Sequence, residues 1–172
     1  MTAHQAGRLI ATVSMTLGLL PQPALDEIQP LPMPAVDPPG VVQRPPLLFG
    51  TELSVPTQEH QIARHPSRFW LRCDAALPDP VVLVYLSDLF TGHEGLPDAG
   101  TRDTPTLDHS VWFHRPYARG DWLLFDLTSR GVSAGRALYS GSVWTQGGVL
   151  VASLAQETLY REPPIHLSRE KP

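Results

Sequence analysis

Apolar and polar residues alternate along several segments of this chain, and a period of two is typical of half-buried β-strands. The alternation is clearest in residues 67–75, where one face of the expected strand carries the apolar side chains of Phe69, Leu71 and Cys73. Strand-forming residues return in four later segments: Thr106–Arg115, Asp121–Thr128, Arg136–Thr145 and Val149–Tyr160. Turn-forming residues separate these segments, so they predict an antiparallel meander of four strands.

Residues 78–90 follow a different period. Their large apolar side chains recur at the spacing of one helical face, at Val82, Tyr85, Leu86, Leu89 and Phe90. We expect Asp79 to cap this helix and Pro80 to occupy its first position, where the missing N–H is tolerated. Because the helix is apolar nearly all round, we expect it to be long, buried and wrapped by the sheet. One helix against one antiparallel sheet predicts an α+β fold.

Two ten-residue segments are similar to each other: residues 5–14, QAGRLIATVS, and residues 146–155, QGGVLVASLA. Either they are two strands that match by chance, or they are copies of one structural unit, 141 residues apart. In the second case the chain holds the last strand of one unit and the whole of another. The copies differ at the next position, where Met15 corresponds to Gln156, which suggests that the second copy carries the site.

Proline sets the expected organisation of the first part of the chain. Of the 172 residues 19 are proline, and ten of these lie between Pro21 and Pro56. Proline lacks the backbone N–H and fixes φ, so this region is not expected to form regular helix or central strand. We expect a strand at residues 7–17, a linker or irregular wrap after it, and the globular mass after residue 65.

Charge and cysteine content exclude several classes of protein. The formal net charge of −4 argues against nucleic acid as a partner, because phosphate binding needs a basic face. Cys73 is the single cysteine, which excludes a disulfide framework and a cysteine-rich zinc site. No apolar run is long enough to span a membrane, and the N-terminal residues lack the pattern of a secretory signal.

Two apparent motifs do not carry the chemistry that they suggest. Residues 131–135 match the G-x-S-x-G pattern of a nucleophilic serine, but a strand and not a helix is expected after Ser133, so we interpret them as a hairpin turn. His109 and His114 are five residues apart on one expected strand and therefore face opposite sides. We expect neither a metal nor a cofactor.

Three polar residues interrupt apolar segments: Asp88 near the end of the helix, Thr106 at the start of a strand, and Gln156 in the last strand. Each has a simpler explanation, as a solvated helix end, a strand cap with Asp108 on the same face, or an exposed edge position. Together they could surround one water molecule. The carboxylate would accept its proton while the hydroxyl and the amide hold it in line for attack.

Two runs of residues are specific enough to carry a family resemblance: TLDHSVWFHRPYARGDWLLFDLTS, from Thr106, and GRALYSGSVWTQGGVLVASLAQE, from Gly135. With the residues upstream to about residue 65, they resemble the C-terminal half of the bacterial and peroxisomal type II acyl-CoA thioesterases. The resemblance implies a hotdog fold and the hydrolysis of fatty acyl-CoA to free fatty acid and CoA. The family's water-activating residues fall on Asp88, as general base, and on Thr106 and Gln156.

Members of this family contain two hotdog units joined by a long linker. The resemblance therefore implies four parts: a remnant last strand of a first unit at residues 1–18, a Pro-rich linker at 19–65, a hotdog thioesterase domain at 66–161, and a tail at 162–172.

The resemblance also implies the partners. Acyl-CoA is the expected small-molecule substrate, in fatty acid and lipid metabolism, and pairing of hotdog units implies a homo-oligomer. A cytoplasmic location is expected, because the chain lacks a Ser-Lys-Leu-type C-terminal signal. Two alternatives stay open: an inactive remnant, or a non-enzymatic hotdog subunit that needs a partner chain. A hotdog enoyl-CoA hydratase is a third, although its expected Asp/His pair is not visible in one loop.

Overall fold

The computed structural model consists of two compact units, Met1–Pro30 and Leu31–Pro172. The residues described here are 2–12, 14, 29, 32–45, 50–57, 66–89 and 104–161. The expected tail at 162–172 and most of the loop between the helix and the next strand lie outside them.

The first unit contains a two-stranded antiparallel hairpin of β1 (Thr2–Gln5) and β2 (Arg8–Thr12). Its turn is formed by Ala6 and Gly7, which both have positive φ, 49° and 75°. Two successive residues with positive φ are typical of the tight turns that join antiparallel strands. The expectation of a single strand at residues 7–17 therefore changes to a hairpin, and the residues beyond Thr12 are described only at position 14.

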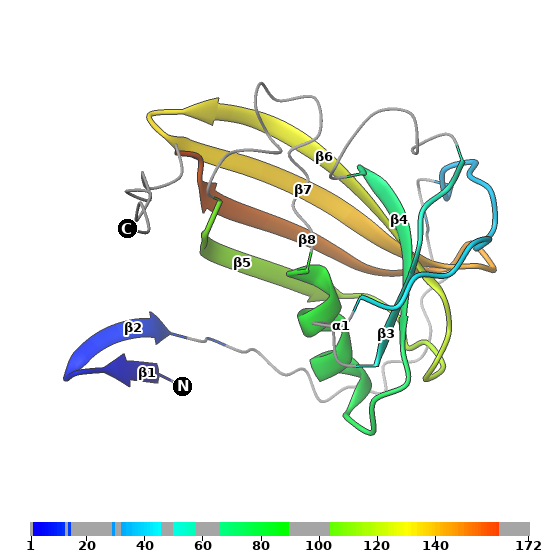
Figure 1. Ribbon diagram of the computed structural model, residues 1–172, viewed down its shortest axis with the longest axis horizontal. Helices are drawn as coiled ribbons and strands as arrows, with labels where there is room; N and C mark the ends of the chain where they lie inside the picture. Colours follow the sequence, from blue (N-terminus) through cyan, green and yellow to red (C-terminus); the bar gives the residue numbers. More distant parts are fainter. Residues whose placement is uncertain are drawn as a thin grey trace, which may run out of the picture. The chain divides into compact units, whose positions relative to one another are not determined.

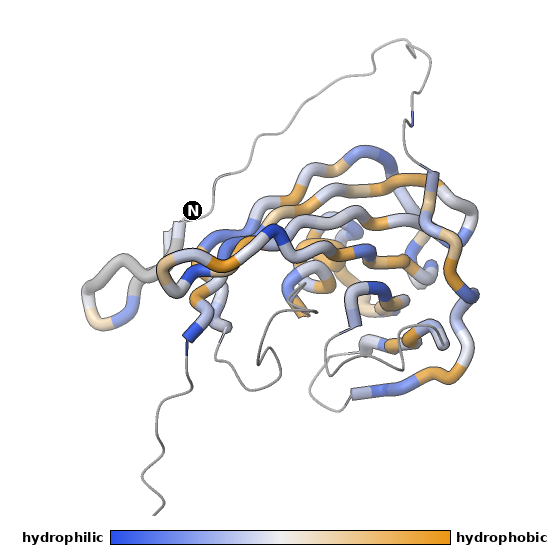
Figure 2. Tube along the Cα trace, turned by 90° about the horizontal axis from the view of Figure 1, so that it is seen from above, coloured by the Kyte–Doolittle hydropathy of each residue, from blue (hydrophilic) through white to orange (hydrophobic). Residues whose placement is uncertain are grey.

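As far as its residues are described, the second unit is a six-stranded antiparallel sheet with one helix on one face, which confirms the α+β expectation. Figure 1 shows the sheet curving around α1. The elements are β3 (Thr51–Ser54), β4 (Arg68–Cys73), α1 (Asp79–Ser87), β5 (Thr106–Phe113), β6 (Leu123–Ser133), β7 (Arg136–Thr145) and β8 (Leu150–Leu159). Their order in the sheet is β3-β4-β6-β7-β8-β5. Apolar residues recur along these strands in Figure 2, as alternating burial requires.

The strand order corrects the predicted meander. Strands β6, β7 and β8 are consecutive hairpin partners, but β5 pairs with β8 and not with β6. The other edge of β6 is occupied by β4, where Phe69 stacks on Phe125 with ring centroids 5.5 Å apart. Since Leu123, Leu124 and Phe125 are almost wholly buried, β6 needs apolar neighbours on both sides, and β4 supplies them.

The alternation predicted for β4 is confirmed. Phe69, Leu71 and Cys73 are at most 4% exposed and belong to the main core cluster, which includes α1. Trp70 points to the opposite face, where it packs with Leu124 and Trp144.

Part of the expected linker is structured and covers this outer face. Met33 and Val36 pack against the Trp70 cluster, and Trp70 Nε1 donates to the carbonyl oxygen of Asp37 at 2.9 Å. Further along, all four residues of β3 are buried, and β3 pairs with β4. Residues 32–57, as far as they are described, therefore belong to the second unit, as the irregular wrap among the two expectations would.

Helix α1 differs in detail from its prediction. It begins at Asp79 with Pro78 as N-cap, so that Asp79 lies in the first turn and does not cap the helix. It has nine residues and is shorter than expected. Val82 and Leu86 are buried as the spacing predicts, whereas Val81 is 50% exposed, so the helix is not buried all round. Phe90 lies outside the described residues.

No helix within the described residues is long and apolar enough to cross a membrane.

A close approach between β6 and β7 makes Gly141 a sensitive position. A Cβ atom at Gly141 would lie 2.6 Å from the backbone oxygen of Asp126 and 2.5 Å from Leu127 Cδ2. Since backbone cannot move aside cheaply, we expect Gly141→Ala to lower the free energy of unfolding by about 1–3 kcal/mol. Urea unfolding measures this, with Gly147→Ala, whose Cβ would have an ordinary contact at 3.7 Å, as control. Equal midpoints for the two variants would contradict this packing.

Candidate active site

The end of α1, the start of β5 and the middle of β8 bring three polar side chains together. Asp88 directly follows α1, Thr106 is the first residue of β5, and Gln156 lies in β8. The oxygen Oδ1 of Asp88 lies 3.0 Å from Thr106 Oγ1 and 2.9 Å from Gln156 Nε2. The three residues predicted from the sequence are thus in mutual contact, while their catalytic roles remain a prediction.

The hydrogen-bond directions in this trio are determined by its chemistry. The Gln156 amide group has two protons, and it donates one to Asp88 Oδ1 and one to Thr106 Oγ1, 2.7 Å away. The Thr106 hydroxyl donates its proton to the same Oδ1. A flipped amide would place its oxygen against the carboxylate, which is unfavourable. Oδ1 therefore receives two donors, and within the described residues Oδ2 receives none.

A β-bulge in β5 turns Thr106 toward the other two residues. In the register with β8, Thr106 pairs with Thr158 and Asp108 with Glu157, so that Leu107 is the extra residue. Thr158 and Gln156 face the same side of β8, and Thr106 joins that side. The expectation that Thr106 and Asp108 share a face is therefore wrong, because the bulge inserts one residue between their pairing positions.

Burial differs sharply across the trio. Gln156 is 2% exposed, whereas Asp88 and Thr106 are exposed to solvent. Tyr139 pairs with Gln156 from β7 and is wholly buried. Burial, and secondly the negative charge of Asp88, raise the pKa of Tyr139, so that its hydroxyl stays protonated. The buried side of the site is therefore formed by two neutral groups, the Gln156 amide and the Tyr139 phenol. The Asp88 carboxylate lies on the side that is exposed to solvent.

Two residues beside the trio were not identified from the sequence. His109 Nε2 lies 2.8 Å from Ser87 Oγ, and Ser87 is the last residue of α1. From the sequence, His109 was expected at most as a metal ligand. Knowledge of the bulge at Leu107 would have identified His109. Because of the bulge, His109 pairs with Gln156 and faces the helix on the same side as Thr106.

The motifs set aside in the sequence have structural roles. Ser133 ends β6, and the hairpin turn that follows is formed by Ala134 and Gly135, with φ of 50° and 72°, as expected of a turn. His114 Nε2 lies 2.9 Å from Ser153 Oγ, on the opposite face of β8 from Gln156. Within the described part of the chain, no group of His, Cys, Asp and Glu side chains is arranged to hold a metal ion.

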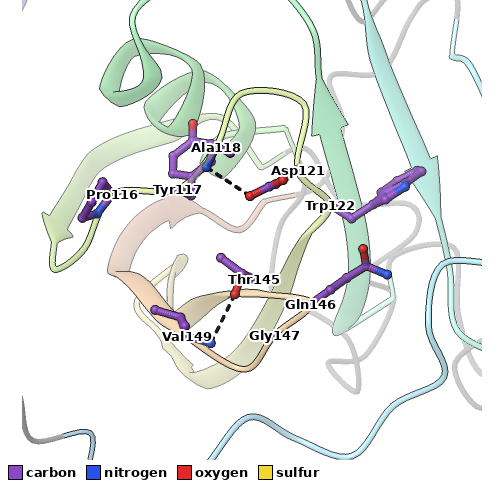
Figure 3. Close-up of a pocket in the computed structure, with 9 residues that line it drawn as sticks. All are labelled: Pro116, Tyr117, Ala118, Asp121, Trp122, Thr145, Gln146, Gly147 and Val149. Carbon is purple, nitrogen blue, oxygen red and sulfur yellow. Dashed lines mark hydrogen bonds between the residues drawn. The ribbon is translucent and has the colours of Figure 1, made fainter.

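A pocket of about 370 Å³ lies at the other end of the sheet, between residues 116–122 and the β7–β8 turn (Figure 3). Its hydrogen bonds shape these two loops: the Ala118 N–H donates to Asp121 Oδ2, and the Val149 N–H to Thr145 Oγ1. Since Gln156 is seven residues along β8 from Val149, the pocket is roughly 20 Å from the trio. It is therefore separate from the candidate active site.

Known proteins resemble this chain in sequence. The family model described as the acyl-CoA thioesterase C-terminal domain matches residues 25–160, starting inside the range predicted as linker. Human acyl-coenzyme A thioesterase 8 is 31% identical over 119 residues, which are 63% of this chain and 37% of that protein. Acyl-CoA thioesterase 2 of Haemophilus influenzae is 36% identical over 87 residues, 46% of this chain and 30% of that protein. The chain thus spans about a third of the length of these curated relatives.

Solved structures confirm the hotdog expectation. Acyl-CoA thioesterase II TesB2 from Mycobacterium marinum aligns with a TM-score of 0.64 at 30% identity, covering 82% of this chain and 60% of that chain. A hot dog fold protein from Alicyclobacillus acidocaldarius aligns with a TM-score of 0.55 at 22% identity, covering 94% of this chain and 66% of that chain, which shows the shared fold.

Proposed function

Because the chain belongs to the acyl-CoA thioesterase C-terminal domain family, we propose that it hydrolyses fatty acyl-CoA to free fatty acid and CoA, using water activated by Asp88, Thr106 and Gln156. One observation carries the assignment of the site: two neutral donors converge on Asp88 Oδ1 and leave Oδ2 to accept a proton. The test is the release of CoA thiol from acyl-CoA by the purified chain.

In the proposed reaction Asp88 is the general base. Its Oδ2 takes a proton from a water molecule as the water oxygen attacks the thioester carbonyl carbon. The tetrahedral intermediate then collapses, the C–S bond breaks, and the electron pair leaves with sulfur as CoA thiolate, which takes up a proton. One water oxygen is thereby incorporated into the fatty acid. No oxidant, metal or other co-reactant is needed for this balance.

Thr106 and Gln156 act as positioning groups in this proposal. Both protons of the Gln156 amide and the proton of the Thr106 hydroxyl are used within the trio, so these groups first hold the base itself. A carboxylate fixed by two donors loses little rotational freedom when the reaction begins, which favours attack from one direction. From the sequence, these two groups were expected to hold the water directly. In this proposal they hold Asp88 in place, and Asp88 positions the water.

Ser87 and Cys73 are poorly placed to act as nucleophiles, which favours water. Ser87 is 2% exposed and donates its proton to the Val84 carbonyl oxygen at 2.8 Å. Cys73 is buried in the core cluster, away from solvent. Neither group is placed to attack a substrate beside the exposed Asp88, which supports the water mechanism.

The proposal includes a homo-oligomer formed by pairing of hotdog units. In the described part of the chain β5 has β8 on one side and no strand on the other. This edge carries Trp112 and Phe113, which are 54% and 49% exposed. Exposed apolar residues on an open edge favour association. Light scattering should give at least twice the mass of the 18.9 kDa chain, and a monomer at micromolar concentration would contradict the pairing.

A further inference from the structure

A second polar link connects the helix to the sheet beside the trio. His109 Nε2 and Ser87 Oγ are 2.8 Å apart, and Ser87 Oγ also lies 2.8 Å from the Val84 carbonyl oxygen. The carbonyl oxygen can only accept, so the single hydroxyl proton of Ser87 is donated to it. Ser87 is then the acceptor toward His109, so His109 Nε2 carries a proton and donates it to Ser87 Oγ.

The two ends of this link adjoin the catalytic trio. Ser87 is the residue before Asp88, and it closes the last turn of α1 by binding the Val84 carbonyl. His109 is the direct partner of Gln156 in the β5–β8 register and faces the helix. The bond therefore ties the helix end that carries the base to the strand pair that carries its two donors.

We propose that His109 is a positioning residue, which holds Asp88 at its distance from Thr106 and Gln156 by donating Nε2–H to Ser87. This inference rests on the proposed thioesterase function. Among the described residues, the side-chain bonds that would still join the helix end to β5 or β8 without this link are those of Asp88 itself. The position of Asp88 would then depend entirely on its own bonds to Thr106 and Gln156. These are bonds of the same carboxylate that takes up the proton in the reaction.

The other ring nitrogen of His109, Nδ1, makes it possible to test the Nε2 bond by itself. His109 Nδ1 and Gln156 Oε1 are both buried, and neither has a hydrogen-bond partner among the described residues. Within the described part of the chain, Nδ1 therefore contributes no hydrogen bond that a substitution could remove. Glutamine at position 109 can offer an amide donor near the place of Nε2, whereas the shorter asparagine cannot reach Ser87. The two variants therefore differ in whether residue 109 can donate a hydrogen bond to Ser87 Oγ.

The experiment measures kcat and KM for acyl-CoA hydrolysis by the full chain. We expect His109→Asn to lower kcat about 10- to 100-fold with KM changed less than threefold, and His109→Gln to recover most of the loss. His114→Asn, which removes an equivalent histidine–serine bond on the other face of β8, is the matched control and should stay within twofold of wild type. Equal kcat for His109→Asn and His114→Asn would overturn the proposal.

Two further measurements keep the outcome unambiguous. Nitrogen NMR of the His109 ring should show a proton on Nε2, and an Nε2 without a proton would overturn the assignment independently of activity. Asp88→Asn is assayed in parallel. If Asp88→Asn is inactive while His109→Asn is fully active, the positioning role fails and the proposed function stands. If wild type releases no CoA, the proposed function itself fails.

Discussion

Asp88→Asn should lower kcat for acyl-CoA hydrolysis by a factor of about 10² to 10⁴, the usual contribution of a general base. The asparagine side chain has the same shape, and its oxygen can still accept from Thr106 and Gln156 in place of Oδ1. The amide nitrogen, however, replaces Oδ2 and cannot take up the proton of the attacking water. The loss is therefore expected in the chemical step, with little effect on substrate binding or on stability.

The measurement is CoA thiol release at saturating acyl-CoA, with urea unfolding to show that the variant is folded. Asp108→Asn is the matched control, because Asp108 is exposed and pairs with Glu157 on the side of β5 away from the trio. It removes the same charge two residues from Thr106 and should leave kcat within twofold. An Asp88→Asn enzyme as fast as the Asp108→Asn enzyme would remove Asp88 from the mechanism.

Gln156→Glu should be the second most damaging change, with kcat lowered about 100-fold and the folded state destabilised. The substitution keeps the size of the side chain but replaces the donor Nε2 by an oxygen, 2.9 Å from Asp88 Oδ1. Two carboxylates at this distance cannot both be ionised, so one proton is shared between them. The base is then partly protonated, and the buried position at 2% exposure makes the added charge costly.

Steady-state kinetics and urea unfolding test this expectation, with Gln146→Glu as control. Gln146 is exposed in the β7–β8 turn, where an added carboxylate is solvated. If Gln156→Glu were as active and as stable as Gln146→Glu, the amide would not be a donor to Asp88, and the hydrogen-bond directions given for the trio would be wrong.

The trio could be predicted because polar residues that interrupt apolar segments are visible in a sequence. Asp88 follows an apolar helix and Gln156 breaks an apolar strand, and both break a pattern whose period is local. The faces of β4 were predictable for the same reason. The family resemblance then identified the same three residues, and the structure brings them into contact.

The parts that escaped prediction depend on contacts between distant residues. The pairing of β5 with β8 is set by competition with β4 for the edge of β6, which no local pattern records. The strand β3 has four residues in a proline-rich region, and only its burial against β4 distinguishes it from a loop. The bulge at Leu107 is likewise a property of the β5–β8 pair, and without it Thr106 and His109 would not both be expected on the side of Gln156.

The most direct test of the central claim, that Asp88 activates water and forms no bond to the acyl group, is a single turnover in water enriched in ¹⁸O. With enzyme in excess over acyl-CoA, the account predicts that the released fatty acid carries one ¹⁸O atom and that the peptide containing Asp88 carries none. An unlabelled fatty acid together with ¹⁸O in the Asp88 carboxyl would show attack by Asp88 on the thioester and would contradict the account.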